Sequence, residues 1–183
     1  MSKPQSRLVV RMRNVRLSRL LCLLGLIASP VMASGTDNTG TVTGLPIPRF
    51  VSLKPSDTPM REGPSKDHRI KWVFKREGLP VEIMAEFDTW RRVRDSEGTE
   101  GWVFHSRLSS RRTALVAPWS KEKTLPLYER EGEGNAVVAR LQPGVLANIE
   151  SCNGRWCRVN GEGFRGWMKQ DFMWGVYPGE AVR

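Results

Sequence analysis

The sequence predicts an all-β protein made of two small β-barrels in tandem, and three observations lead to this prediction. A unit of about 65 residues occurs twice along the chain. Within each copy, apolar and polar residues alternate with the period of two that half-buried strands show. Turn-forming residues separate these short stretches, and no long stretch has the 3.6-residue period of a helix. Short strands at close spacing are typical of small barrels.

Residues 1–33 are predicted to be an export signal. Six basic residues and no acidic one accompany an apolar run at 20–28, and small residues suit cleavage after Ala33. The apolar run is shorter than the roughly 20 residues of a membrane-spanning helix, so an uncleaved anchor ranks second. We therefore expect a periplasmic or secreted protein with no stable membrane insertion after cleavage.

Cleavage of this signal would change the charge of the chain. The full sequence has 29 Lys and Arg against 19 Asp and Glu, a formal net charge of +10. Removing six cations and no anion leaves 23 minus 19, or +4. The positive charge that suggests a nucleic acid partner therefore lies largely in the signal, and we expect no nucleic acid partner.

The remaining chain divides at changes in composition. Residues 34–48 are rich in Gly, Thr and Pro, which predicts a flexible linker. The first barrel is expected at 49–112 and the second at 113–179, followed by a C-terminal tail at 180–183. The apolar stretch 113–119 is expected to begin the second barrel and to help pack the two barrels together.

The repeat is clearest where GLPVEIMAEFDTWRRV (78–93) is placed over GVLANIESCNGRWCRV (144–159). Gly, Ile, Trp, Arg and Val coincide without a gap. Each block then reaches a Gly-Trp pair, with Trp102 in the first copy and Trp167 in the second. We expect these two tryptophans to pack inside each barrel or across its face.

Several short motifs recur in both copies. The first copy carries MREGPS, REGLPVEI, WRRV and GWVFHSRLS, and the second carries QPGVLANI, WCRV and GWMKQDFMW, with YEREGEGN in place of the Gly-Pro-Ser turn. These motifs resemble those of bacterial SH3-like (SH3b) domains, with Trp102, Trp156 and Trp167 marking the barrel pattern. The resemblance implies two tandem SH3-like β-barrels in a binding or targeting role. Such modules often recognise peptides or cell-wall peptidoglycan.

The chain offers no recognisable catalytic or metal-binding set. Structural zinc takes four Cys or His ligands, whereas the two His, His68 and His105, lie in the first copy and the two remaining Cys in the second. A cysteine nucleophile needs a base, and no Gly-x-Ser-x-Gly elbow occurs. We therefore expect no enzymatic activity, no cofactor and no metal.

Cys152 and Cys157 are the cysteines that remain after cleavage. In an oxidising compartment the simplest state is one intramolecular disulfide. Asn153-Gly154 is a strong hairpin signal. If the turn is this dipeptide alone, the cysteines are diagonal neighbours, and if the loop extends to Trp156 they face each other directly. In both cases the cysteines lie close enough to bond.

The same two positions of the first copy hold Glu86 and Arg91, which carry opposite charges. Opposite charges across a strand pair stabilise a hairpin. We therefore expect the first barrel to hold this hairpin by an ion pair and the second to hold it covalently.

Aromatic residues are the candidates for a ligand site. Trp72, Trp90 and Tyr128 are the residues that we expect to line a groove, because aromatic side chains provide rigid contact area for peptides or sugars. The alternative is that these rings pack in the core or between the barrels. Two functions follow: a non-catalytic exported module that binds cell-wall peptidoglycan or an envelope protein, or a structural or regulatory envelope subunit. A protein partner of the subunit could bind at a sheet edge.

Overall fold

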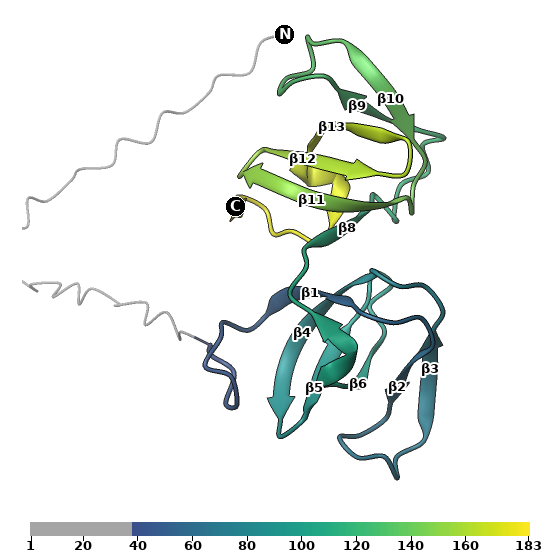
Figure 1. Ribbon diagram of the computed structural model, residues 1–183, viewed down its shortest axis with the longest axis vertical. Helices are drawn as coiled ribbons and strands as arrows, with labels where there is room; N and C mark the ends of the chain where they lie inside the picture. The colour runs from purple at the N-terminus through teal and green to yellow at the C-terminus, as the bar shows by residue number, and fades with distance from the viewer. Residues whose placement is uncertain (1–37) are drawn as a thin grey trace, which may run out of the picture. The chain divides into compact units, whose positions relative to one another are not determined.

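The computed structural model describes residues 38–183, and these residues are all-β (Figure 1). Their strands form two sheets, one from each copy of the repeat. Among the described residues, no helix is both long enough and apolar enough to cross a membrane. The predicted signal peptide, residues 1–33, lies outside the described residues.

The first barrel is a seven-stranded sheet in the order β3-β2-β6-β5-β4-β1-β7. Its neighbouring strands are antiparallel. The elements are β1 (Arg49–Leu53), β2 (Thr58–Arg61), β3 (Ile70–Phe74), β4 (Pro80–Phe87), β5 (Trp90–Arg94), β6 (Glu100–Phe104), the 3-10 helix η1 (His105–Arg107) and β7 (Leu108–Ser109).

The second barrel repeats this arrangement in the order β10-β9-β13-β12-β11-β8-β14, with β15 added beside β11. The elements are β8 (Thr113–Val116), β9 (Leu125–Tyr128), β10 (Val137–Leu141), β11 (Leu146–Asn153), β12 (Trp156–Gly161), β13 (Phe164–Lys169), the 3-10 helix η2 (Gln170–Phe172), β14 (Met173–Trp174) and β15 (Ala181–Val182). The two strand orders match element by element, so the prediction of an all-β chain with two tandem barrels is confirmed.

The longest strand of each barrel carries a bulge at the same place in the repeat. The register shifts between Ile83 and Ala85 in β4 and between Ile149 and Ser151 in β11. A bulge bends the strand and increases its twist, which helps a small sheet to curl. The curvature therefore comes from matching positions of the two copies.

Each barrel has its own core, built from matching positions. In the first barrel the fully buried residues include Leu53, Met60, Val81, Val93 and Val103. In the second barrel the matching positions hold Val116, Leu127, Ala147, Val159 and Met168, all of them buried. The apolar side chains at every second position of the strands thus face the barrel interior, as the period of two predicts.

The glycine of each Gly-Trp pair lies where a neighbouring strand approaches closely. A Cβ on Gly101 would lie 2.6 Å from Met60 Cγ, and a Cβ on Gly166 would lie 2.7 Å from the Tyr128 carbonyl oxygen. Side chains alternate along a strand, so the tryptophan after each glycine faces away from the core. Trp102 and Trp167 are accordingly half-buried on the outer face, and neither lies inside its barrel.

Part of the segment expected to be a flexible linker is folded onto the first barrel. Thr39 bridges Pro46, and the Gly40 amide donates to the Leu45 carbonyl at 2.8 Å. The amide of Thr43 donates to the carboxylate of Glu86 at 2.8 Å. Residues 38–48 are therefore held by a buried acid of β4, which the composition of the segment does not reveal.

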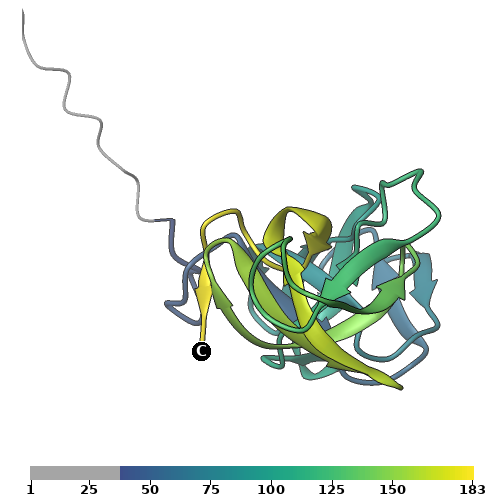
Figure 2. The same ribbon diagram turned by 90° about the horizontal axis from the view of Figure 1, so that it is seen from above.

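The predicted tail at 180–183 belongs to the second barrel. Ala181 and Val182 form β15 and pair with the end of β11. Figure 2 shows this short yellow strand at the C-terminus. Val182 is buried, and Arg112 holds Glu180 at 2.7 Å. Strands β4 and β11 are the longest, and an unpaired strand end is exposed to association with other chains. A segment next to each terminus of the described chain covers one of these ends.

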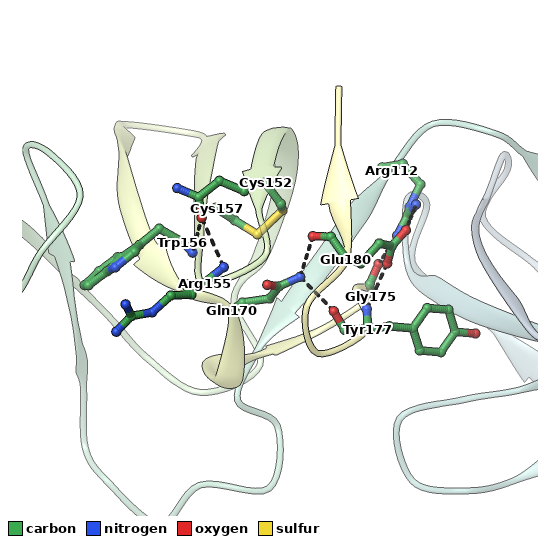
Figure 3. Close-up of a disulfide and its surroundings, with 10 residues drawn as sticks. Arg112, Cys152, Arg155, Trp156, Cys157, Gln170, Gly175, Tyr177 and Glu180 are labelled. Carbon is green, nitrogen blue, oxygen red and sulfur yellow. Dashed lines mark hydrogen bonds and ion pairs between the residues drawn. A yellow bond between two sulfur atoms is a disulfide. The ribbon is translucent and has the colours of Figure 1, made fainter.

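The cysteines form a disulfide across the β11–β12 hairpin (Figure 3). Cys152 pairs directly with Cys157 in the register, as expected for the loop that extends to Trp156. In the first barrel Glu86 pairs with Arg91 in the same register, and Arg91 Nε lies 3.4 Å from Glu86 Oε1. The predicted disulfide in the hairpin of the second barrel and the predicted ion pair in the hairpin of the first barrel are both confirmed.

The two barrels contact each other within one compact unit. Thr113 Oγ1, in the apolar stretch that begins the second barrel, donates to the Gly78 carbonyl oxygen at 2.7 Å. On another side, the ring of Phe50 lies 5.1 Å from the ring of Trp174 and 4.7 Å from that of Tyr177. These aromatic residues therefore serve packing between the barrels.

Candidate binding groove

A groove of about 300 Å³ lies on the first barrel, and we call it the Trp90 groove. It is formed by β2, the β2–β3 loop, the start of β5, the end of β6 and η1. Its lining consists of Pro59, Arg61, Lys66, Trp90, Phe104, Ser106 and Arg107. All of these elements belong to a single barrel, so the barrel alone sets the shape of the groove.

Two aromatic rings form the apolar part of the Trp90 groove. Trp90 opens β5 and pairs with Phe104 in the register of β5 and β6. The two rings meet edge to face with centroids 5.4 Å apart, which is a favourable aromatic geometry. Trp90 is only 8% exposed, so its ring is held by packing. Phe104 is half-buried and offers the more accessible ring.

Three cations surround these rings, and no acidic residue lines the groove. Arg61 Nη1 donates to the His68 carbonyl oxygen at 2.7 Å, which orients the guanidinium. Lys66 and Arg107 are exposed. The groove therefore combines a rigid apolar floor with a concentrated positive charge.

The Gly-Pro-Ser turn positions Lys66 at this groove. Ser65 Oγ donates to Asp67 Oδ2 at 2.9 Å, and the Ser65 amide donates to the Gly63 carbonyl oxygen at 3.0 Å. The His68 ring packs against Gly63, where any larger side chain would collide with it. The loop is thus ordered by its own hydrogen bonds.

The matching place on the second barrel is chemically different. The ring of Tyr128 meets the ring of Trp156 edge to face at 5.6 Å. Lys169 forms an ion pair with Glu133 beside these rings. The same fold position thus carries a self-neutralised ion pair and a tyrosine in the second barrel.

Trp72 lies at a different place from Trp90 and Tyr128. It lines a hollow of about 400 Å³ between the barrels, together with Phe74 and Leu79 of the first barrel and Leu115 of the second. Its side chain is 55% exposed, which leaves it free for contact with a partner. The structure thus distributes the three aromatic candidates over three places. That any of them binds a ligand stays a prediction.

The sequence by itself does not point to the three cations of the Trp90 groove, Arg61, Lys66 and Arg107. Each is a single basic residue in a chain with many, so charge alone does not single it out. A usable signal was the comparison of the copies. The positions that match Arg61 and Lys66 hold Tyr128 and Glu133 in the second copy.

Charge and aromatic contact are the chemistry that this groove offers. Within residues 38–183, no group of three or more His, Cys, Asp or Glu side chains is placed to hold a metal ion. Both cysteines of the second barrel are bonded to each other. The lining of the Trp90 groove supplies cations, aromatic rings and one hydroxyl.

Comparison with protein families identifies the fold. The family model for the bacterial SH3 domain matches residues 54–110 and again residues 121–175. The chain belongs to the bacterial SH3 domain family. The SH3 domain of this family is a binding domain, and together with the disulfide it indicates an extracytoplasmic protein.

Similarity to individual proteins is low. No curated protein matches the chain. Among solved structures, NlpC2 from Trichomonas vaginalis matches with 13% identity and a TM-score of 0.31, over 69% of this chain and 48% of that one. NlpC1 from the same organism matches with 14% identity and a TM-score of 0.30, over 69% and 45%. The chain thus spans about half the length of these two proteins.

Proposed function

We propose that this bacterial SH3 protein is a non-catalytic exported binding module of the cell envelope. It recognises peptidoglycan or a peptide or protein partner, and the Trp90 groove of the first barrel is the contact site. The single observation that supports this proposal is the groove itself, an aromatic floor ringed by three cations on a rigid barrel.

The groove suits binding because its aromatic floor, Arg61 and the β2–β3 loop are already ordered. Trp90 is packed in place, Arg61 is hydrogen-bonded to the β2–β3 loop, and this loop is ordered internally. Binding then has to order only the side chains of Lys66 and Arg107, so less entropy is lost on association than at a fully mobile site. Its volume of about 300 Å³ is also at the lower end of ordinary ligand sites.

Retention of the exported protein on purified cell-wall sacculi, and separately on envelope extract, tests the proposal. We expect retention on at least one of the two, and its absence from both would refute the binding role. Phe104→Ala removes the more accessible ring and should weaken retention at an unchanged fold, checked by circular dichroism. Lys169→Ala is the matched control, because Lys169 pairs with Trp156 as Phe104 pairs with Trp90.

A second candidate function is a structural or regulatory envelope subunit whose aromatic residues serve packing between the barrels. The Phe50, Trp174 and Tyr177 contacts favour it. The Tyr177 hydroxyl also donates a hydrogen bond to Glu82 Oε1 of the first barrel at 2.7 Å. Under this alternative, Phe104→Ala and Trp72→Ala leave retention unchanged, whereas Phe50→Ala lowers the melting temperature.

A further inference from the structure

The two barrels present the same surface position with opposite electrostatics, and strand register defines the correspondence. Arg61 pairs with Trp102 as Tyr128 pairs with Trp167. Both β2–β3 and β9–β10 loops hold eight residues, so Lys66 corresponds to Glu133. The 3-10 helices η1 and η2 follow β6 and β13 directly, so their residues correspond in order. Ser106 therefore matches Asp171, and Arg107 matches Phe172.

The charges at these matched positions differ by four. In the first barrel Arg61, Lys66 and Arg107 give +3, with no acid in the lining. In the second barrel the matched positions hold one cation, Lys169, and two acids, Glu133 and Asp171, which give −1. The surrounding fold is the same, so this difference comes from the side chains alone.

The neutralisation of the two sites differs as well. In the second barrel Lys169 is already paired with Glu133. In the part of the chain that the structure describes, the side chains of Lys66 and Arg107 donate no hydrogen bond or ion pair to a protein acceptor. These cations are therefore available to an anionic partner without first breaking an internal contact.

We propose that the Trp90 groove binds an extended peptide segment that carries carboxylates, and that only the first barrel binds it. The inference rests on the proposed function and names its ligand class. Arginine forms charge-assisted hydrogen bonds with carboxylates, and lysine adds a point charge. The ring of Phe104, supported by the packed ring of Trp90, contacts the apolar stems and backbone between the charges. A peptide fits this combination of anionic and apolar recognition.

The matched position of the second barrel does not suit the same ligand. Glu133 and Asp171 would repel the carboxylates that the first barrel attracts. Tyr128 occupies the place of the cation Arg61 and packs on Trp156. The second barrel therefore supports the first through the interbarrel contacts and does not duplicate its site.

Fluorescence anisotropy with a fluorescein-labelled hexaglutamate peptide tests this inference on the exported protein. We expect saturable binding of one peptide per chain, weaker by about tenfold for hexaglutamine, and a loss of affinity with added salt. Lys66→Glu with Arg107→Glu should reduce affinity at least about tenfold. Both residues are exposed, so the melting temperature should not change.

Lys121→Glu with Lys123→Glu is the control, because it makes the same change in net charge at exposed positions of the second barrel. We expect less than about a twofold effect from it, since neither lysine lines the Trp90 groove and screened charges outside a site contribute little. Equal losses in the two double variants, equal binding of the two peptides, or two peptides per chain would overturn the inference. Displacement of hexaglutamate by inorganic phosphate at matching concentration would also overturn it, because a general anion site would then suffice.

The sacculus experiment separates this inference from the proposed function. Retention on sacculi that persists in Lys66→Glu with Arg107→Glu keeps the envelope role and refutes the carboxylate site. Hexaglutamate binding that depends on these residues, without retention on sacculi or envelope extract, keeps the carboxylate site and refutes the envelope role.

Discussion

Replacing Glu86 by Gln should destabilise the first barrel, because this buried carboxylate joins the segment before β1 to the β4–β5 hairpin. Its Oε2 accepts hydrogen bonds from the amides of Val42 at 3.0 Å and Thr43 at 2.8 Å. Its Oε1 accepts from Thr43 Oγ1 at 2.7 Å and from Arg49 Nη2 at 2.8 Å. The side chain is 0% exposed. In a glutamine, one of the two oxygens is replaced by an NH₂ group, which cannot accept the hydrogen bonds that this oxygen accepts.

The magnitude follows from the ionisation of this carboxyl group. Burial alone would raise the pKa of Glu86, but hydrogen bonds from Thr43 and Arg49 outweigh it and lower the pKa from 4.5 to about 2. A difference of this size corresponds to about 3 kcal/mol of stability at neutral pH. Because the folded-state pKa is depressed, this stability is present above about pH 4.5 and is lost as the pH falls towards about 2.

Urea unfolding at pH 7 and pH 3 measures this contribution. We expect Glu86→Gln to lower the free energy of unfolding by about 3 kcal/mol at pH 7, and by about half of that at pH 3. Glu62→Gln, at an exposed ion pair with Arg69, is the control and should leave the free energy of unfolding nearly unchanged. Hydrogen exchange of the Val42 and Thr43 amides would report local release of the segment.

Two results would refute this reasoning about Glu86. A loss of stability below about 1 kcal/mol at pH 7, together with unchanged hydrogen exchange, would mean that the buried carboxylate is not what holds the segment. An equal loss at pH 7 and pH 3 would mean that the effect does not come from ionisation.

Three further predictions concern the hairpins and the barrel contact. Reduction of the disulfide should cost about 2 kcal/mol by chain entropy, and alkylation of the exported protein without reductant should leave its mass unchanged. Gly101→Ala should cost at least about 2 kcal/mol in thermal unfolding, because its Cβ would lie 2.8 Å from the Arg61 carbonyl oxygen, whereas Gly134→Ala, with open space around it, should be near neutral. Burial and the hydrogen bond to Glu82 raise the pKa of Tyr177, so in an absorbance titration Tyr177 should not ionise in the ordinary pH range of a tyrosine.

Much of the fold could be predicted because its signals are local. The alternation of apolar residues, the turn residues and the repeated Gly-Trp pair each act over a few positions, and the structure follows them in both copies. The pairing of Cys152 with Cys157 was predictable for the same reason, since a short hairpin leaves little choice of partner.

The ends of the barrels were not predictable in this way. Residues 38–48 have the composition of a linker, and their order depends on Glu86, which lies about 40 positions further along the chain. The last residues look like a tail, and their order depends on the free end of β11 and on Arg112. Contacts between distant positions leave no periodic trace in the segment that they hold.

Some features of the candidate site could likewise be predicted from local sequence patterns, and others depend on tertiary contacts. Sequence alone determined the repeat, the barrel type, the aromatic residues worth testing and the hairpin that holds the disulfide, because these depend on patterns within a few residues. Only the tertiary structure decided that Trp90 lies with Arg61, Lys66 and Arg107, while Trp72 lies in a hollow between the barrels. Arg61 and Lys66 come from β2 and the loop that follows it, whereas Arg107 comes from a 3-10 helix about 40 positions further along the chain, and the closure of the sheet brings them to one groove.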